Sequence, residues 1–133
     1  AYNSIYDIIY EAFNNEYIVK KEDTDYWIFI IENYYRLGKN LGKSEFEIRK
    51  GISYCLSPIY DRLGMYKNAF HELSFMANEA SWVNNQPNTL KWAKENNLIW
   101  DLRYDINRRM ESDSNIDQES FQRYYEEVNK YYG

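Results

Sequence analysis

Apolar residues recur every three or four positions along most of this chain, the spacing that gathers them on one face of an α-helix. No stretch alternates apolar and polar residues for long enough to predict a β-sheet. We therefore expect an all-α fold in which residues 1–133 form a single domain of five or six helices, packed as an irregular or orthogonal bundle. The first helix, predicted over residues 3–14, carries its apolar face on Ile5, Ile8, Ile9, Ala12 and Phe13.

Capping residues indicate where the next two helices begin. Asp23 or Thr24 is positioned to cap a helix over 25–37, whose narrow polar face predicts a central place in the fold. Ser44 is followed three residues later by Glu47, as in a capping box. A third helix is therefore expected to start just after Ser44.

Glycine and proline predict where these helices end. Gly38 and Gly42 are expected to form a loose turn, and Gly64 to close the third helical segment. Pro58 lies inside that segment, and proline lacks the amide hydrogen that a helix interior needs. We therefore expect a kink or a restart of the helix at Pro58.

The second half of the chain carries weaker signals. Thr89 is positioned to cap a fifth helical region, and Asn96 with Asn97 is expected to interrupt that region. The predicted elements are helices over 65–83, 89–110 and after Asp117, with loops at 84–88 and 112–115.

One local pattern resembles the core of a tetratricopeptide helix hairpin. Tetratricopeptide domains need about three repeats of roughly 34 residues to bury a continuous core, and no second copy of this pattern occurs. We interpret the pair as an ordinary αα-hairpin with a glycine in its turn. The residues that carry the resemblance are Tyr60, Gly64, Tyr66, Ala69, Leu73 and Ala77.

Composition narrows the class of protein. A chain of 133 residues with 44% hydrophobic residues can bury a core without disulfides or metals. Cys55, the single cysteine, is expected to pack as a small apolar residue, which fits a reducing, cytoplasmic setting. No apolar run approaches the roughly 20 residues that span a bilayer, so we expect no membrane segment.

The amino-acid composition indicates the kind of genome that encodes the chain. The chain has 15 Asn and 13 Ile but only 6 Ala and 5 Gly, as is typical of an AT-rich genome. We infer a low-GC bacterium, or a phage or mobile element of one, with an AT-rich eukaryotic parasite as the lesser alternative.

Catalytic chemistry finds little support in the sequence. His71, the only imidazole, lies mid-helix beside an apolar stripe and has no distinctive acid–base partner. One His and one Cys cannot build a closed zinc site. Two carboxylate pairs share helix faces, Asp101 with Asp105 and Glu72 with Glu79, but isolated pairs are typical of solvated surface. We expect no catalytic residue, metal or cofactor; an enzyme of unrecognised class is the third reading.

A basic segment supports a second reading. Residues 36–50 contain five positive charges against Glu45 and Glu47, and a helix over 44–54 could enter the major groove of DNA. The net charge of −5 argues against it, because affinity for DNA comes largely from neutralised phosphates. A helix-turn-helix-like regulator is therefore the alternative; its contacts would be Arg36, Lys39, Lys43, Arg49 and Lys50.

Aromatic residues support the leading reading. The chain carries 25 Tyr, Phe and Trp, more than a core of this size needs, and exposed Tyr and Trp are enriched at interfaces. Codon bias or a homodimer would account for the same excess. We predict a non-enzymatic, accessory or inhibitory protein that binds a protein partner through an acidic, tyrosine-rich surface. The residues predicted to bind are Tyr124, Tyr125, Glu126, Glu127, Tyr131 and Tyr132.

Overall fold

The computed structural model describes residues 2–73, 85–98 and 126. Within these ranges the chain forms α-helices and short 3-10 helices and contains no β-strand. The predicted all-α fold is therefore confirmed. The helix predicted over 65–83 is described only as far as Leu73, and the region predicted over 89–110 only as far as Leu98. The rest of both, the loop at 112–115 and, except for Glu126, the helix predicted after Asp117 lie outside the described residues.

The first two helices pack against each other through a short, folded connection. Within that connection only Val19 is buried, at 7% exposed, whereas Tyr17 is 82% and Ile18 39% exposed. Asp23 occupies the N-cap position of the second helix, although its side chain makes no capping hydrogen bond. The elements are α1 (Tyr2–Asn14), the 3-10 helices η1 (Glu16–Ile18) and η2 (Lys21–Asp23), and α2 (Thr24–Asn40).

The third and fourth helices form the predicted αα-hairpin. α3 (Glu45–Arg62) starts with the predicted capping box, in which the Ser44 hydroxyl accepts from the Glu47 amide and the Glu47 carboxylate accepts from the Ser44 amide. α4 is described over Tyr66–Leu73. Gly64 takes a φ of +77° in the turn between them, a left-handed conformation that glycine adopts without strain.

A buried carboxylate of α3 anchors the start of α5 (Pro87–Glu95). Asp61 accepts hydrogen bonds from the Thr89 amide at 2.6 Å and the Thr89 hydroxyl at 2.7 Å, and from the Asn88 amide group at 3.2 Å. Thr89 was expected to be the N-cap, and that assignment is wrong. Pro87 opens the helix two residues earlier because its missing amide hydrogen is not needed there. The helix ends before Asn96, as expected.

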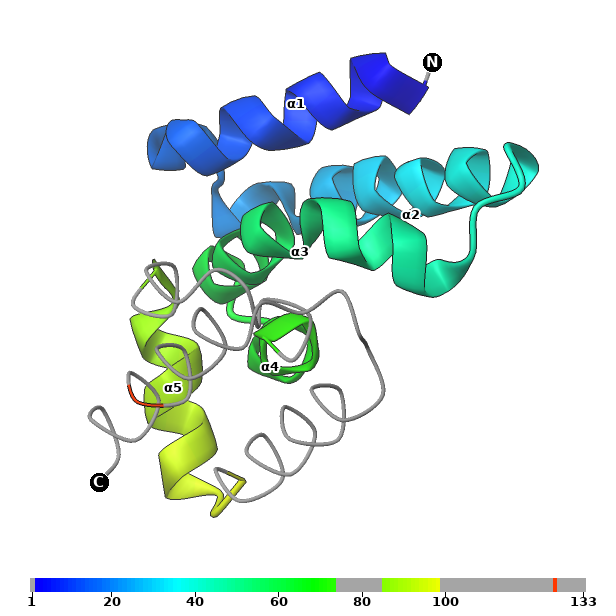
Figure 1. The fold of residues 1–133 in the computed structure, drawn as a ribbon. Helices are drawn as coiled ribbons and strands as arrows, with labels where there is room; N and C mark the ends of the chain where they lie inside the picture. Colours follow the sequence, from blue (N-terminus) through cyan, green and yellow to red (C-terminus); the bar gives the residue numbers. More distant parts are fainter. Residues whose placement is uncertain (1, 74–84, 99–125, 127–133) are drawn as a thin grey trace.

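The helices do not run parallel. Figure 1 shows α1 lying along α2, whereas α4 is viewed end-on and α5 crosses their direction. α3 lies between these two sets and contacts α1, α2, α4 and α5. The described helices therefore form the irregular, partly orthogonal bundle expected from their unequal lengths.

Pro58 does not break α3, which runs without interruption from Glu45 to Arg62. Of the two predicted outcomes, a restart of the helix at Pro58 is therefore wrong, whereas a kink there stays a prediction. A proline in a helix interior costs about 3 kcal/mol, but its neighbours Leu56 and Ile59 are both fully buried. Burying one large apolar side chain contributes about 1.5–3 kcal/mol, so the core contacts on either side of Pro58 are sufficient to offset the lost hydrogen bond.

Gly38 does not form a turn either; it is a buried residue of α2, and the turn begins after Asn40. A Cβ atom at Gly38 would lie 2.7 Å from Ile48 Cδ1 and 3.1 Å from Tyr2 Cε2. The glycine therefore allows α1, α2 and α3 to approach closely. Gly42 does form the predicted turn, with a φ of +81°.

Tyrosines contribute substantially to the packing of α1 against its neighbours. The rings of Tyr2 and Tyr34 stack with their centroids 4.4 Å apart, and the hydroxyls of Tyr6 and Tyr54 lie 2.6 Å apart. Part of the aromatic excess is therefore used inside the fold. The apolar core around them consists mainly of Ile9, Trp27, Ile31, Ile48, Ile52, Leu56, Ile59 and Leu63.

The two glycines inside helices predict opposite effects of one substitution. Gly51→Ala should raise the free energy of unfolding by about 0.5–1 kcal/mol, because alanine favours helix and no atom lies within 4 Å of the new Cβ. Gly38→Ala should lower it by about 1 kcal/mol, since overpacking against the buried Ile48 outweighs the helix preference. Urea denaturation followed by circular dichroism measures both. A stabilising Gly38→Ala would contradict close packing at this position.

Candidate functional site

A polar pocket between α3 and α4 is the strongest candidate for a functional site in the described part of the chain. Its volume is about 400 Å³, within the range of small-molecule sites. Every described residue that lines it has a polar or charged side chain. These residues are Arg49 and Tyr60 from α3, and Lys67, Asn68, His71 and Glu72 from α4.

An ion pair between Arg49 and Glu72 forms one wall of this pocket. The side chain of Glu72 is only 2% exposed and that of Arg49 is 16% exposed, so both groups are largely removed from water. Arg49 also pairs with Glu45 at 3.0 Å, and its guanidinium lies 4.9 Å from the centre of the Tyr35 ring. These contacts hold the Arg49 side chain in one orientation.

Ser53 and Tyr35 complete the hydrogen bonding of the buried carboxylate. The Ser53 hydroxyl lies 2.7 Å from Glu72 Oε2 and 2.7 Å from the Arg49 carbonyl oxygen. The hydroxyl carries one proton, so it donates to only one of these two oxygens at a time. The Tyr35 hydroxyl donates to Glu72 Oε1 at 3.4 Å. Glu72 on α4 is thereby connected to side chains of both α2 and α3.

The environment of this network shifts several pKa values. Burial raises the pKa of Glu72 above the usual glutamate range, and the nearby Arg49 and Ser53 offset part of that shift. Burial also raises the pKa values of Tyr35 and Tyr60, so both remain neutral phenols that can donate a hydrogen bond. On the exposed side of the pair, the hydrogen bond from Arg49 lowers the pKa of Glu45.

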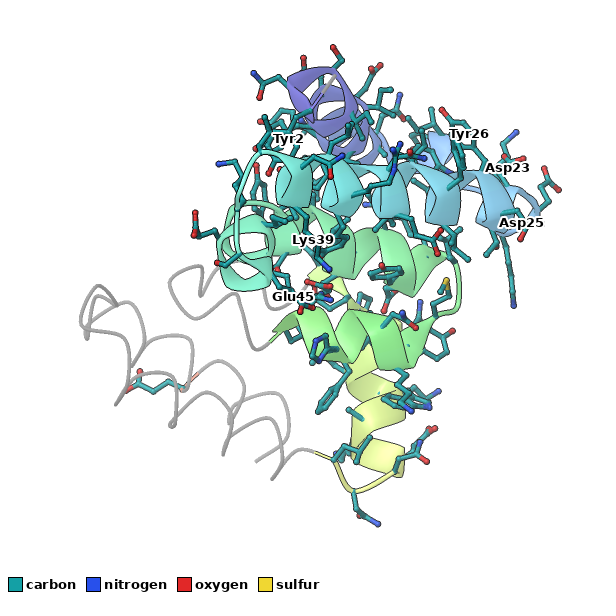
Figure 2. The ribbon with its side chains drawn as sticks, turned by 90° about the vertical axis from the view of Figure 1, so that its right-hand side faces the viewer. Tyr2, Asp23, Asp25, Tyr26, Lys39 and Glu45 are labelled. Atoms are coloured by element: carbon teal, nitrogen blue, oxygen red, sulfur yellow. The ribbon has the colours of Figure 1, made fainter. Side chains whose placement is uncertain are left out.

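A second hollow of about 410 Å³ lies beside Tyr35 on α2. Arg36 and Lys39, two of the basic residues singled out in the sequence, line it and are exposed. Lys39 also lowers the pKa of Glu45, and Figure 2 shows the two side chains close together where α2 passes the start of α3. α2 therefore extends the polar region beyond the pocket between α3 and α4.

The five basic residues of the segment 36–50 do not occupy equivalent positions. Lys43 lies over the Tyr2 ring, with its ammonium 5.7 Å from the ring centre. Arg49 is held in the buried ion pair described above, and the side chain of Lys50 lies outside the described part of the structure. The structure therefore brings Arg36 and Lys39 together but directs Arg49 inward.

A different surface combines exposed aromatic and acidic side chains at the start of α2. Phe29 is 63% exposed and Tyr26 51%. Figure 2 shows Asp23, Asp25 and Tyr26 projecting from the same end of the molecule. We name Asp23, Asp25, Tyr26 and Phe29 the acidic–aromatic edge. Tyr26 and Phe29 lie three residues apart, which places them on one side of α2.

The predicted binding residues near the C-terminus fall largely outside the described structure. Glu126 is described, and it is helical and exposed. The other five, Tyr124, Tyr125, Glu127, Tyr131 and Tyr132, lie outside the described residues, as do Asp101, Asp105 and Glu79.

Nucleophilic catalysis and metal binding have little support among the described residues. Cys55 is fully buried, and burial raises the pKa of its thiol to about 12, so the nucleophilic thiolate is absent at neutral pH. Within residues 2–73 and 85–98, no three His, Cys, Asp or Glu side chains gather closely enough to hold a metal ion. None of the helices described is long and apolar enough to cross a membrane.

Glu72 is the residue that the sequence analysis missed, since the pair with Glu79 was interpreted as solvated surface. Glu72 is in fact 1% exposed. A signal was present: it follows Ala69 by three residues and directly precedes Leu73, so it lies at the margin of the apolar stripe. Its partners Arg49 and Ser53 lie on another helix, and the periodicity of one helix does not predict its contacts with another.

The buried carboxylate predicts a pH dependence. Because the pKa of Glu72 is raised in the folded chain, its proton favours folding. This contribution is complete below the unfolded pKa of about 4.3 and is lost as pH rises through the folded pKa. Glu72→Gln cannot ionise, so its stability relative to wild type should increase as pH rises through that window.

Urea denaturation at a series of pH values measures this difference, with the exposed Glu95→Gln as the matched control for loss of one glutamate charge. A relative stability of Glu72→Gln that falls with rising pH would contradict the prediction. That result would mean that the attraction of Arg49 for the ionised carboxylate outweighs the effect of burial.

Comparisons of the chain with protein-family models, with curated proteins and with solved structures find no match. A function for this chain therefore has to be argued from its own residues and their geometry.

Proposed function

We propose that this chain is a non-enzymatic protein-binding module, an accessory or inhibitory protein of a phage or mobile element of a low-GC bacterium. It binds its partner through acidic, tyrosine-rich surface. The observation that carries the proposal is the acidic–aromatic edge, where the two large side chains of Tyr26 and Phe29 are half or more exposed beside two aspartates.

The exposed rings support binding because of their chemistry. An exposed Tyr or Phe supplies a large contact area with few rotatable bonds, and such residues dominate the binding energy of many interfaces. Tyr26 and Phe29 lie one turn apart on a helix whose other side is buried through Trp27, Ile30 and Ile31. The helix is therefore held rigidly while its two outer rings remain available to a partner.

Charge indicates the kind of partner. Residues 16–25 contain four acidic residues and two lysines, and the whole chain carries a net charge of −5. Glu22, Asp23 and Asp25 are exposed. A partner with a basic surface around an apolar patch would complement this edge, and complementary charge increases the rate of association.

The predicted C-terminal surface is part of the same proposal. Residues 111–133 contain six acidic residues with four tyrosines among them, the composition found at the acidic–aromatic edge. Both surfaces suit the same class of basic partner.

DNA binding remains the alternative, with weaker support. Arg49 already pairs with Glu45 and Glu72, so a phosphate would have to compete with two carboxylates for it. Glu45 and Glu47 are exposed at the start of α3, where a recognition helix would meet the DNA backbone. Both carboxylates repel phosphate.

A double substitution at the edge tests the leading proposal. Tyr26→Ser with Phe29→Ser should weaken partner binding by about tenfold or more, as expected for two aromatic contacts. Both side chains are mainly exposed, so the free energy of unfolding should change by no more than about 1 kcal/mol. Tagged chains are used to capture partners from a low-GC bacterial lysate treated with nuclease, and affinity is then measured with the purified partner.

Leu41→Ser is the matched control, because Leu41 is also 63% exposed but follows the opposite end of α2. It should bind as wild type does. Equal binding by the double variant and the control would remove the edge from the proposal, and partners lost on nuclease treatment would favour the DNA-binding alternative.

The C-terminal surface has its own test. Alanine at Tyr124, Tyr125, Tyr131 and Tyr132 together should weaken binding of the same partner while the circular dichroism spectrum is retained. Unchanged binding would exclude this surface from the interaction. Because the acidic surfaces are proposed to meet a basic partner, wild-type affinity should also fall steeply as salt concentration rises.

A further inference from the structure

We propose that the outer face of α2 pairs with the same face of a second copy of this chain, forming a symmetric antiparallel dimer. One side of α2 is buried in the core, and the opposite side is exposed. We define the outer face by five exposed residues on that opposite side. They are Glu22, in the short helix η2 that leads into α2, and Asp25, Tyr26, Phe29 and Arg36 of α2 itself.

Two aromatic rings form the apolar centre of this face. Phe29 is 63% exposed, and its ring has no polar atom that could bond to water. Tyr26, one turn earlier on the helix and 51% exposed, extends the same apolar area. Aromatic rings on two facing helices pack favourably against each other. Two copies that meet at Phe29 therefore cover the apolar area of both.

The exposed charges change sign along the helix. Residues 22–25 carry three exposed carboxylates and no cation, whereas residues 32–39 carry one exposed carboxylate and two cations. Figure 2 shows Asp25 at the start of α2 and the basic Lys39 nearer its end. Within the described part of the chain, neither Arg36 nor the two carboxylates of the outer face form an ion pair. The outer face therefore presents one acidic end and one basic end.

An antiparallel pair brings these unlike charges together. In a two-fold dimer, a residue on the axis meets itself, and residues equally far on either side of it meet each other. Phe29 lies seven residues after Glu22 and seven before Arg36, about two helical turns each way. With Phe29 on the axis, Glu22 of each copy therefore faces Arg36 of the other. Asp25 lies one turn from Glu22, within reach of the same guanidinium.

A second copy complements this face more fully than the basic partner proposed above. A basic surface matches only the acidic end and repels Arg36, whereas a second copy turned by two-fold symmetry matches both ends. Interfaces that bury less than about 1,200 Å² are weak, and we expect a single helix pair to fall in that range. The dimer should therefore dissociate in about the micromolar range.

Sedimentation equilibrium of the purified full chain, without any other protein, tests the proposal. We expect a monomer–dimer equilibrium. Phe29→Ser should weaken dimerisation by about tenfold or more, because both copies lose the central ring. Leu41→Ser, at a residue that is also 63% exposed but lies beyond the end of α2, should dimerise as wild type does. A wild-type chain that stays monomeric up to about 1 mM, or equal dimerisation by these two variants, would overturn the proposal.

Charge reversal tests the antiparallel arrangement. Arg36→Glu, and separately Glu22→Lys with Asp25→Lys, should each weaken self-association by about tenfold or more, because like charges then face each other twice in the dimer. A mixture of the two variants should form a heterodimer, since both crossings then join opposite charges. The control mixture contains Lys94→Glu, the same charge reversal at an exposed position of α5, in place of Arg36→Glu. Equal heterodimer formation in both mixtures would overturn the antiparallel pairing.

The dimer does not rest on the protein binding proposed above, although both use Tyr26 and Phe29, and the two fail separately. Self-association is measured on the purified chain alone, whereas affinity for a captured partner is measured at concentrations where the dimer is dissociated. A dimer with the expected response to charge reversal, from a chain that captures no partner, would support this inference and remove the proposed function. A chain that captures a partner but stays monomeric would do the reverse.

Discussion

The buried ion pair of Arg49 and Glu72 is the interaction on which the arrangement of α2, α3 and α4 depends. Removing two charges from water costs several kcal/mol for each ion, and the cost is recovered only when geometry and hydrogen bonding are both good. Here Ser53 from α3 and Tyr35 from α2 both bond to the same carboxylate. A shift of α4 along α3 would leave Glu72 buried without these partners. The pair therefore selects one register of the helices, a specificity that apolar contacts alone do not impose.

A buried carboxylate with partners on another helix also fixes the position of α5. The start of that helix has no capping side chain of its own, since Gln86 at the N-cap makes no such hydrogen bond. Asp61 of α3 satisfies the Thr89 amide and hydroxyl in its place. The carboxylates of Glu72 and Asp61, both of low exposure, thus fix how α4 and α5 lie against α3, because their hydrogen bonds join different helices. Polar contacts also join α3 to α1, since the Tyr6 and Tyr54 hydroxyls lie 2.6 Å apart and Arg62 donates to the Ala12 carbonyl oxygen at 2.9 Å.

The tyrosines divide into an inner and an outer set. The inner set packs rings against rings, as Tyr2 does on Tyr34, or lies beside the ion pair, as Tyr35 does. The outer set includes Tyr17 and Tyr26, whose rings are half or more exposed. Codon bias would account for a high number of tyrosines, but it would not explain why exposed rings and aspartates meet at one end of α2. That placement is why the acidic–aromatic edge, and not tyrosine content as such, supports a binding function.

The sequence by itself determined the helical class and several helix boundaries, because these depend on neighbours three or four residues apart. The capping box at Ser44, the left-handed turn at Gly64 and the end of α5 before Asn96 are all local effects. Only the tertiary structure decided where local preferences are overridden: α3 continues through Pro58, and α2 continues through Gly38. It also decided that Glu72 is buried with Arg49, residues 23 positions apart. The physical reason is that burial and ion pairing across helices depend on which faces meet, and no spacing within one helix encodes the partner that another helix supplies.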